Sequence, residues 1–200
     1  MLLVFNQSTV TEHWDPLNNP SGNEMSSRNH PAFGSVGSWL YAALLGVRLG
    51  DEATSGFSAP GLPPGAPQAR APQDGYGFAR AVVAPEIVTD SRLPGASGGV
   101  ATPLGLVAAS WAFDAGAASL ALNASFPVSC RGEVRTPSAA ALPPATLSIT
   151  DAASGAAIWK DGAFVAGAVP GVFGGAACGS AGERVCLDVG SGDYAFLIAA

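Results

Sequence analysis

The pattern of apolar and polar residues differs between the two ends of the chain. Before residue 50, apolar residues recur every three or four positions, as on one face of a helix. Pro31 stands where the first turn is expected, so we predict a helix that begins at Asn29 and is closed by Gly46 or Gly50. Its apolar positions are Val36, Trp39, Leu40, Leu44 and Val47.

Beyond Tyr76 the apolar residues alternate with polar or small ones, which predicts half-buried antiparallel strands. Clusters of turn-forming residues, such as Gly190-Ser191-Gly192-Asp193, separate these runs, so we expect a β-sandwich of roughly eight strands and not a parallel sheet. The alternating positions are Val107, Ala109, Trp111 and Phe113; Leu120, Leu122, Ala124 and Phe126; and Tyr194, Phe196 and Ile198.

Segments without periodicity divide the chain. Residues 53–74 are rich in proline and glycine, which is typical of a linker or a long surface loop. We therefore expect a short helical region over 1–52 and a sandwich domain over 75–200. Within the sandwich, Ser138–Ala145 and Ala166–Ala177 are Ala-, Gly- and Pro-rich and are predicted to be loops.

Composition narrows the possible partners. Of the 200 residues, 12% are charged and the net charge is -6, so nucleic acid is excluded as a partner because phosphate binding needs clustered cations. The longest apolar helical stretch, Trp39 to Val47, is far shorter than the roughly 20 residues that span a bilayer, so we expect no membrane segment. The first residues lack the basic region of a secretory signal, and the compartment stays undetermined.

Cysteines and sequons add two open questions. For Cys130, Cys178 and Cys186 we favour free buried thiols, with a Cys178–Cys186 disulfide across a hairpin as the alternative. Two stretches, Asn6-Gln7-Ser8 and Asn123-Ala124-Ser125, satisfy the N-glycosylation sequon, which has meaning only in a secreted chain.

Candidate chemistry gathers before the predicted helix. Glu12 lies close in sequence to Trp14 and Asp15, and His30 follows Asn29, so a carboxylate, an aromatic face and an imidazole occur together, as in sugar sites. Purely structural roles are the alternative for two of the residues in this region. The ring of His30 could hydrogen-bond only the backbone at the helix start, and Trp39 is expected in the core. The two histidines have no metal-ligand spacing, and no nucleophile elbow or phosphate loop occurs, so we expect no metal and no cofactor.

Several motifs together resemble one family, the bacterial-type α-L-rhamnosidases, over nearly the whole chain. Two of them, Thr9-Val10-Thr11-Glu12-His13-Trp14-Asp15 and Ser27-Arg28-Asn29-His30-Pro31-Ala32-Phe33-Gly34-Ser35-Val36-Gly37-Ser38-Trp39-Leu40-Tyr41, resemble the end of the catalytic domain. Others resemble the C-terminal β-sandwich of that family: Gly75-Tyr76-Gly77-Phe78, Gly98-Gly99-Val100-Ala101-Thr102-Pro103-Leu104-Gly105, Ser110-Trp111 and Gly190-Ser191-Gly192-Asp193-Tyr194.

The resemblance implies a fold, a substrate and an activity. The family's catalytic domain is an (α/α)6 barrel, so the predicted fold is mainly β, with a C-terminal antiparallel sandwich preceded by a short α-helical remnant of that barrel. By resemblance Glu12 is the general base of an inverting hydrolase, and His30 and Trp14 contact the rhamnose. The expected partner is a rhamnose-containing glycoside or polysaccharide.

The sequence also departs from the family. Inversion needs two carboxylates, a base and an acid, and the family's general acid belongs to an earlier part of the barrel. Thr11 replaces the tryptophan that usually precedes the base. We therefore expect a C-terminal rhamnosidase fragment that does not hydrolyse by itself, or alternatively a non-catalytic carbohydrate-binding or structural module. The apolar helix face is expected either to fold back onto the sandwich or to stay exposed and self-associate.

Overall fold

The computed structural model describes residues 35–50, 78–87, 92–137, 145–179 and 182–199. By its contacts the chain divides into two compact units, Met1–Leu40 and Tyr41–Ala200, and the second holds the strands described below. The predicted linker over 53–74 lies outside the described residues. Among the described residues, no helix has both the length and the apolar character that a bilayer span requires.

The helical part that the structure describes consists of two short segments. Helix α3 (Val36–Trp39) continues into a π-helical turn, η1 (Leu40–Leu44), and the predicted start at Asn29 lies outside the described residues. Trp39 was expected in the core, but its side chain is 52% exposed. Neither of the two helical segments in the described residues has a buried side chain, so no apolar face is covered there.

Gly46 ends the helical part by reversing the chain into a strand. Its φ of 82° lies in the left-handed region, and a Cβ there would lie 2.3 Å from the carbonyl carbon of Ala84. Closure at Gly46 is thus confirmed. Val47, which we assigned to the helix, instead begins strand β1 (Val47–Leu49), because this stretch pairs antiparallel with β2 (Arg80–Val83).

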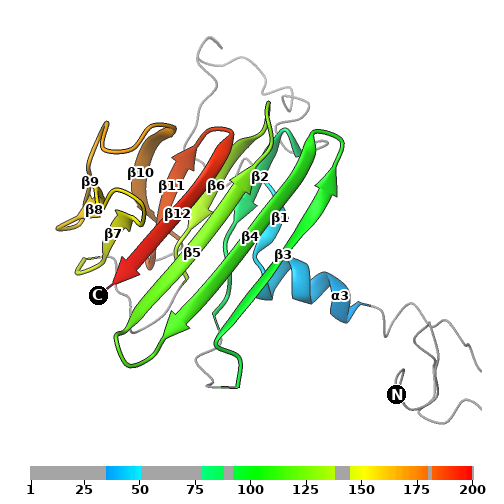
Figure 1. Cartoon of the computed structure of the whole chain (residues 1–200), viewed down its shortest axis with the longest axis horizontal. Coiled ribbons are helices and arrows are strands. Elements are labelled where there is room, and N and C mark those ends of the chain that lie inside the picture. Colours follow the sequence, from blue (N-terminus) through cyan, green and yellow to red (C-terminus); the bar gives the residue numbers. More distant parts are fainter. Residues whose placement is uncertain (1–34, 51–77, 88–91, 138–144, 180–181, 200) are drawn as a thin grey trace, which may run out of the picture. The chain divides into compact units, whose positions relative to one another are not determined.

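Two sheets form the sandwich (Figure 1). The smaller sheet has the order β1-β2-β6-β11-β10 and the larger sheet the order β3-β4-β5-β12-β7-β8-β9. All paired strands are antiparallel except β2 and β6, which are parallel. The remaining strands are β3 (Gly95–Thr102), β4 (Gly105–Asp114), β5 (Ser119–Phe126), β6 (Arg131–Arg135), β7 (Ser148–Asp151), β8 (Ala157–Lys160), β9 (Ala163–Phe164), β10 (Val172–Cys178), β11 (Arg184–Val189) and β12 (Gly192–Ala199).

The predicted antiparallel sandwich is confirmed, and it is larger than expected. The described residues form twelve strands where we predicted roughly eight. The three runs with period two are β4, β5 and β12, which lie side by side in the larger sheet. Along β5, and along β12 from Asp193 onward, the residues alternate between buried and more exposed, as the sequence pattern requires.

The core lies between the sheets, where large residues of one sheet meet small ones of the other. The ring of Phe126 on β5 lies against Gly132 on β6, and a Cβ on Gly132 would come within 2.6 Å of that ring. No other residue than glycine therefore fits at this crossing without a shift of the sheets. The largest fully buried side chains are Phe196, Leu120, Leu122, Leu147, Ile149, Ile158, Leu187 and Ile198.

One predicted loop is a strand. Residues 172–177, within the predicted loop Ala166–Ala177, form most of β10, which pairs along its length with β11. The sequence signal failed because β10 is the last strand of the smaller sheet and has few large side chains to bury. Of the other predicted loop, residues 138–144 lie outside the described residues.

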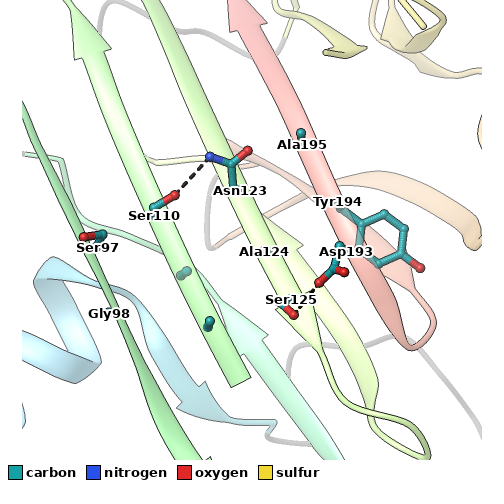
Figure 2. A pocket seen from close by; sticks show the side chains of 11 residues that line it. Ser97, Gly98, Ser110, Asn123, Ala124, Ser125, Asp193, Tyr194 and Ala195 are labelled. Carbon is teal, nitrogen blue, oxygen red and sulfur yellow. Dashed lines mark hydrogen bonds between the residues drawn. The ribbon is translucent and has the colours of Figure 1, made fainter. Parts of the chain in front are cut away.

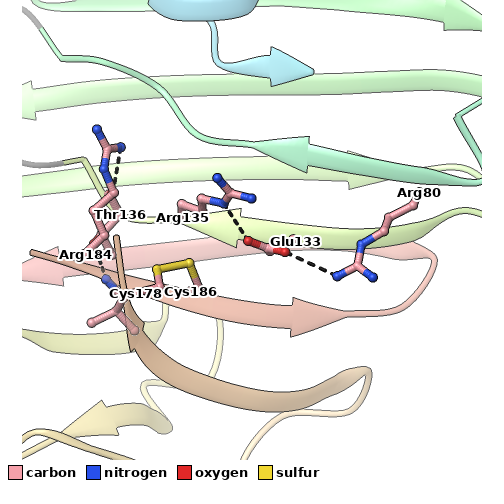
Figure 3. Close-up of a disulfide and its surroundings, with 8 residues drawn as sticks. Arg80, Glu133, Arg135, Thr136, Cys178, Arg184 and Cys186 are labelled. Carbon is pink, nitrogen blue, oxygen red and sulfur yellow. Dashed lines mark hydrogen bonds and ion pairs between the residues drawn. A yellow bond between two sulfur atoms is a disulfide. The ribbon is translucent and has the colours of Figure 1, made fainter. Parts of the chain in front are cut away.

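The cysteines divide between two states. Cys130 is free and buried, as we favoured, but Cys178 and Cys186 form a disulfide, so free thiols were the wrong reading for that pair (Figure 3). The bond joins β10 to β11 diagonally, since Cys178 is opposite Arg184 and Cys186 is opposite Ala176. Burial raises the pKa of the Cys130 thiol, which keeps it protonated and unreactive at neutral pH.

Ion pairs cover the outward side of the smaller sheet. Glu133 on β6 accepts hydrogen bonds from Arg80 Nη2 at 3.3 Å and Arg135 Nε at 2.5 Å, and its side chain is 5% exposed (Figure 3). Arg131 binds both carboxylate oxygens of Asp188, at 2.9 and 2.5 Å. These pairs add side-chain contacts to the backbone pairing of β2 with β6 and of β6 with β11.

Candidate functional site

The residues predicted to act on sugar lie outside the described part of the chain. Glu12, Trp14 and His30 all fall in residues 1–34, so the structure neither brings them together nor separates them. The assignment of Glu12 as general base stays a prediction. The site that the structure does describe is on the sandwich.

The outward face of the larger sheet is built from small side chains. Strand pairing places Ser97, Ser110 and Asn123 in one row across β3, β4 and β5, and Ala195 of β12 continues it. The next row contains Ala108 and Ser125, with Asp193 of β12 beside them. Because no bulky group stands among these residues, the face is hollowed.

The hollow has a volume of about 440 Å³ and spans four strands (Figure 2). Asn123 Nδ2 donates to Ser110 Oγ at 3.0 Å, and Ser125 Oγ donates to Asp193 Oδ1 at 2.5 Å. An adjoining hollow of about 360 Å³ shares Ser97, Ser110 and Asn123 with it. Together they form a shallow groove with Asn123 near its middle.

The lining of this groove offers polar groups but not the pair of carboxylates that inverting glycoside hydrolysis uses. Among its lining residues Asp193 is the one carboxylate, whereas inverting glycoside hydrolysis needs two at about 6.5–9.5 Å. The aromatic residues of the lining, Tyr194 and Trp111, are 7% and 3% exposed, so neither offers an open ring face to a sugar. Hydroxyl, amide and carboxylate groups are what the groove presents.

Tyr194 faces the core and fixes the turn before β12. Its hydroxyl donates toward the carbonyl oxygens of Gly171 and Gly190, each at 3.2 Å, and its ring stacks with that of Phe196. Burial raises the pKa of the Tyr194 hydroxyl, so it stays a neutral donor. The Gly-Ser-Gly-Asp-Tyr motif thus contributes the groove carboxylate, Asp193, and a residue that packs in the core, Tyr194.

The other sandwich motifs have structural roles. The indole of Trp111 donates to the carbonyl of Leu44 at 2.7 Å, which ties the end of η1 to β4. Thr102 Oγ1 donates to the Gly105 carbonyl at 2.7 Å and accepts from the Leu104 amide, so it closes the turn between β3 and β4. Within the described residues, no three His, Cys, Asp or Glu side chains gather in a way that suits a metal ion.

Comparison with known proteins finds a relative in the family that the sequence motifs resemble. No protein-family model matches the chain. The curated α-L-rhamnosidase of Alteromonas sp. (strain LOR) is 28% identical over 127 residues, which make up 61% of this chain and 11% of that protein. This chain resembles part of an α-L-rhamnosidase. The resemblance that the motifs predict is therefore confirmed.

Solved rhamnosidases share the fold. The α-L-rhamnosidase of Dictyoglumus thermophilum matches with a TM-score of 0.61 at 21% identity, over 100% of this chain and 17% of its own. The Streptomyces avermitilis α-L-rhamnosidase, solved in complex with L-rhamnose, matches with a TM-score of 0.54 at 21% identity, over 98% of this chain and 14% of its own. The chain thus spans less than a fifth of the length of these three rhamnosidases.

The sequence did not reveal the groove. Asn123 and Asp193 each belong to a motif that we noted, a sequon and a rhamnosidase landmark, but nothing in the sequence placed them on one face. The groove combines β3, β4, β5 and β12, and the pairing of β5 with β12 joins residues about seventy positions apart. The groove could have been found only from the pairing of β5 with β12, which no sequence motif indicates.

Proposed function

We propose that this chain is part of an inverting α-L-rhamnosidase, acting on a rhamnose-containing glycoside. The observation that carries the proposal is the sequence match over 127 residues with the curated rhamnosidase of Alteromonas. Glu12 is the general base that removes a proton from the attacking water, while His30 and Trp14 contact the rhamnose ring. The base loop and the sandwich belong to one enzyme.

Hydrolysis further requires a proton donor opposite the base. In an inverting reaction the water attacks one face of the sugar while a carboxylic acid protonates the leaving oxygen on the other. We propose that this acid is supplied by protein outside the chain, so that the isolated chain does not turn over substrate.

An assay with an aryl α-L-rhamnoside tests this proposal. We expect no release of the aryl group above the buffer rate from the purified chain, and the same result for Glu12→Gln. Rhamnose release that is lost in Glu12→Gln but kept in Glu24→Gln, a change at a nearby acid, would show that the chain contains a complete catalytic pair. The inactivity part of the proposal would then be wrong.

The groove supports a second function, carbohydrate binding without catalysis. Its hydroxyl, amide and carboxylate groups can bind sugar hydroxyls, although it lacks an open aromatic platform. Calorimetric titration with a rhamnose-containing oligosaccharide separates the two functions. Binding that survives Glu12→Gln and is lost in Asp193→Ala favours the groove, whereas loss in Glu12→Gln alone favours the general-base loop.

A further inference from the structure

We propose that Asn123 is an N-glycosylation site and that the groove around it accommodates the first sugar of the glycan. The proposal concerns a covalent modification and does not depend on the rhamnosidase function. It rests on three separate observations: a sequon at this position, an open space around the side chain, and a disulfide elsewhere in the same sandwich.

The sequon is Asn123-Ala124-Ser125, in which the middle residue is not proline. It lies within β5, so its alternate residues face opposite sides of the sheet. Ala124 is buried in the core, at 3% exposure, while Asn123 faces outward and is exposed. The strand thus presents the acceptor amide to solvent, on the face away from the core.

The hydrogen bond that the Asn123 amide makes is compatible with glycosylation. Its Nδ2 carries two hydrogens, and one of them is used in the 3.0 Å bond to Ser110 Oγ. A glycosylated Nδ2 keeps one hydrogen, so the bond to Ser110 can persist after the sugar is attached. That bond holds the side chain in one orientation over the groove (Figure 2).

The surroundings of Asn123 leave room for a sugar ring. The two hollows that it lines have volumes of about 440 and 360 Å³, and its neighbours in the row are Ser97, Ser110 and Ala195. Asp193 and Ser125 stand in the next row and offer a carboxylate and a hydroxyl to sugar hydroxyls. Bulky residues at these positions would instead bury the acceptor.

The disulfide points to the compartment that the modification needs. Cys178 and Cys186 are bonded, and such bonds persist in oxidising environments, the secretory pathway among them. N-glycosylation of sequons takes place in the same pathway. The sequence left the compartment undetermined. The disulfide is the structural observation that indicates a compartment in which the sequon can be glycosylated.

The transfer itself is a simple substitution at the first carbon of the sugar. The donor is a lipid-linked oligosaccharide pyrophosphate, and the catalyst is the host's oligosaccharyltransferase. A bond forms between Asn123 Nδ2 and that carbon, the bond from the carbon to the pyrophosphate oxygen breaks, and the pyrophosphate leaves with the electron pair. The displaced amide proton goes to a base of the transferase. This chain is the acceptor only.

Expression of the full chain behind a cleavable secretory signal in a eukaryotic host tests the proposal. We introduce Asn6→Gln, which removes the other sequon, so that any glycan mass reports on Asn123. We expect the intact mass to exceed that of the polypeptide and to fall to the polypeptide value after treatment with peptide N-glycosidase. Peptide mapping by mass spectrometry should place the glycan on Asn123.

Matched variants test whether the glycan depends on the sequon or on the neighbouring surface residues. Asn123→Gln and Ser125→Ala should abolish the glycan, Ser125→Thr should retain it, and Ser110→Ala should retain it because the hydroxyl is not part of the sequon. An unmodified Asn123 in secreted protein whose Cys178–Cys186 bond has formed would overturn the proposal. So would a glycan that persists in Asn123→Gln.

Discussion

Glu133 is a buried carboxylate between two guanidinium groups. Arg80 and Arg135 reach it from neighbouring positions on the outward side of the smaller sheet, and the Arg80 and Glu133 side chains are 8% and 5% exposed. Removing one partner of a buried ion pair is costly because the remaining charge stays in a poorly solvated place. Arg80 and Arg135 therefore share one carboxylate, that of Glu133.

Glu133→Gln should lower the free energy of unfolding by about 3–5 kcal/mol, because it removes the buried negative charge that Arg80 and Arg135 both contact. Urea denaturation followed by circular dichroism measures this loss. Glu86→Gln is the matched control, since Glu86 pairs with Arg184 with 46% of its side chain exposed, and it should cost at most about 1 kcal/mol. Equal losses in the two variants would contradict a special role for burial.

At the same scale, the sequence could identify some residues and not others. The alternation of large apolar residues correctly predicted Leu120, Leu122 and Phe196 as core, because side chains of a half-buried strand follow a strict period of two. Trp39 was predicted as core from helical spacing and is exposed. Periodicity reports which side of an element is apolar, but not whether a partner covers it.

Among the elements, the hairpin of β10 and β11 shows what pairing adds to sequence. β10 contains Gly174, Gly175, Ala176 and Ala177, which lack any alternation of large apolar residues, and it is a strand only because β11 supplies its hydrogen bonds. In contrast, β4, β5 and β12 carry their own signal. The number of strands was underestimated because edge strands of this kind give no pattern.

The disulfide should stabilise this hairpin against unfolding. It closes a loop with a sequence separation of 8, for which the chain-entropy model gives about 2.5 kcal/mol. The double variant Cys178→Ala, Cys186→Ala should lose that amount in urea denaturation, and reduction of the unmodified protein should give a similar loss. The stability of the double variant should not respond to reductant, whereas Cys130→Ala, which removes the free thiol and keeps the disulfide, should lose stability on reduction as the parent does. A double variant as stable as the parent would contradict the expectation.

At the scale of the whole molecule, the sandwich was predictable and its groove was not. Turn clusters and alternation suffice for two antiparallel sheets, whereas the groove depends on which strands become neighbours in space. The predicted sugar-contacting residues are a different case, since Glu12, Trp14 and His30 come from motif resemblance alone and lie outside the described residues. Their roles stay predictions that the rhamnoside assay addresses.

Apolar residues in the helical part should cause the chain to self-associate. Val36, Trp39 and Leu40 are 58%, 52% and 44% exposed, which is unusual for three large apolar side chains so close in sequence. We expect light scattering to show a mass that rises with concentration and returns to that of a monomer in the double variant Trp39→Ser, Leu40→Ser. Phe173→Ser is the control, since Phe173 is 66% exposed but lies in β10. A monomer at every concentration would contradict this.

The position of the disulfide has one more consequence, for aggregation. A terminal strand presents free backbone N–H and C=O groups that can recruit a strand of another molecule, and a strand that peels away exposes the next one. Within the described residues β10 is the last strand of its sheet, and the covalent bond to β11 prevents it from detaching. Oxidation thereby guards the sheet against intermolecular pairing, and a reducing environment would remove that protection before the core is lost.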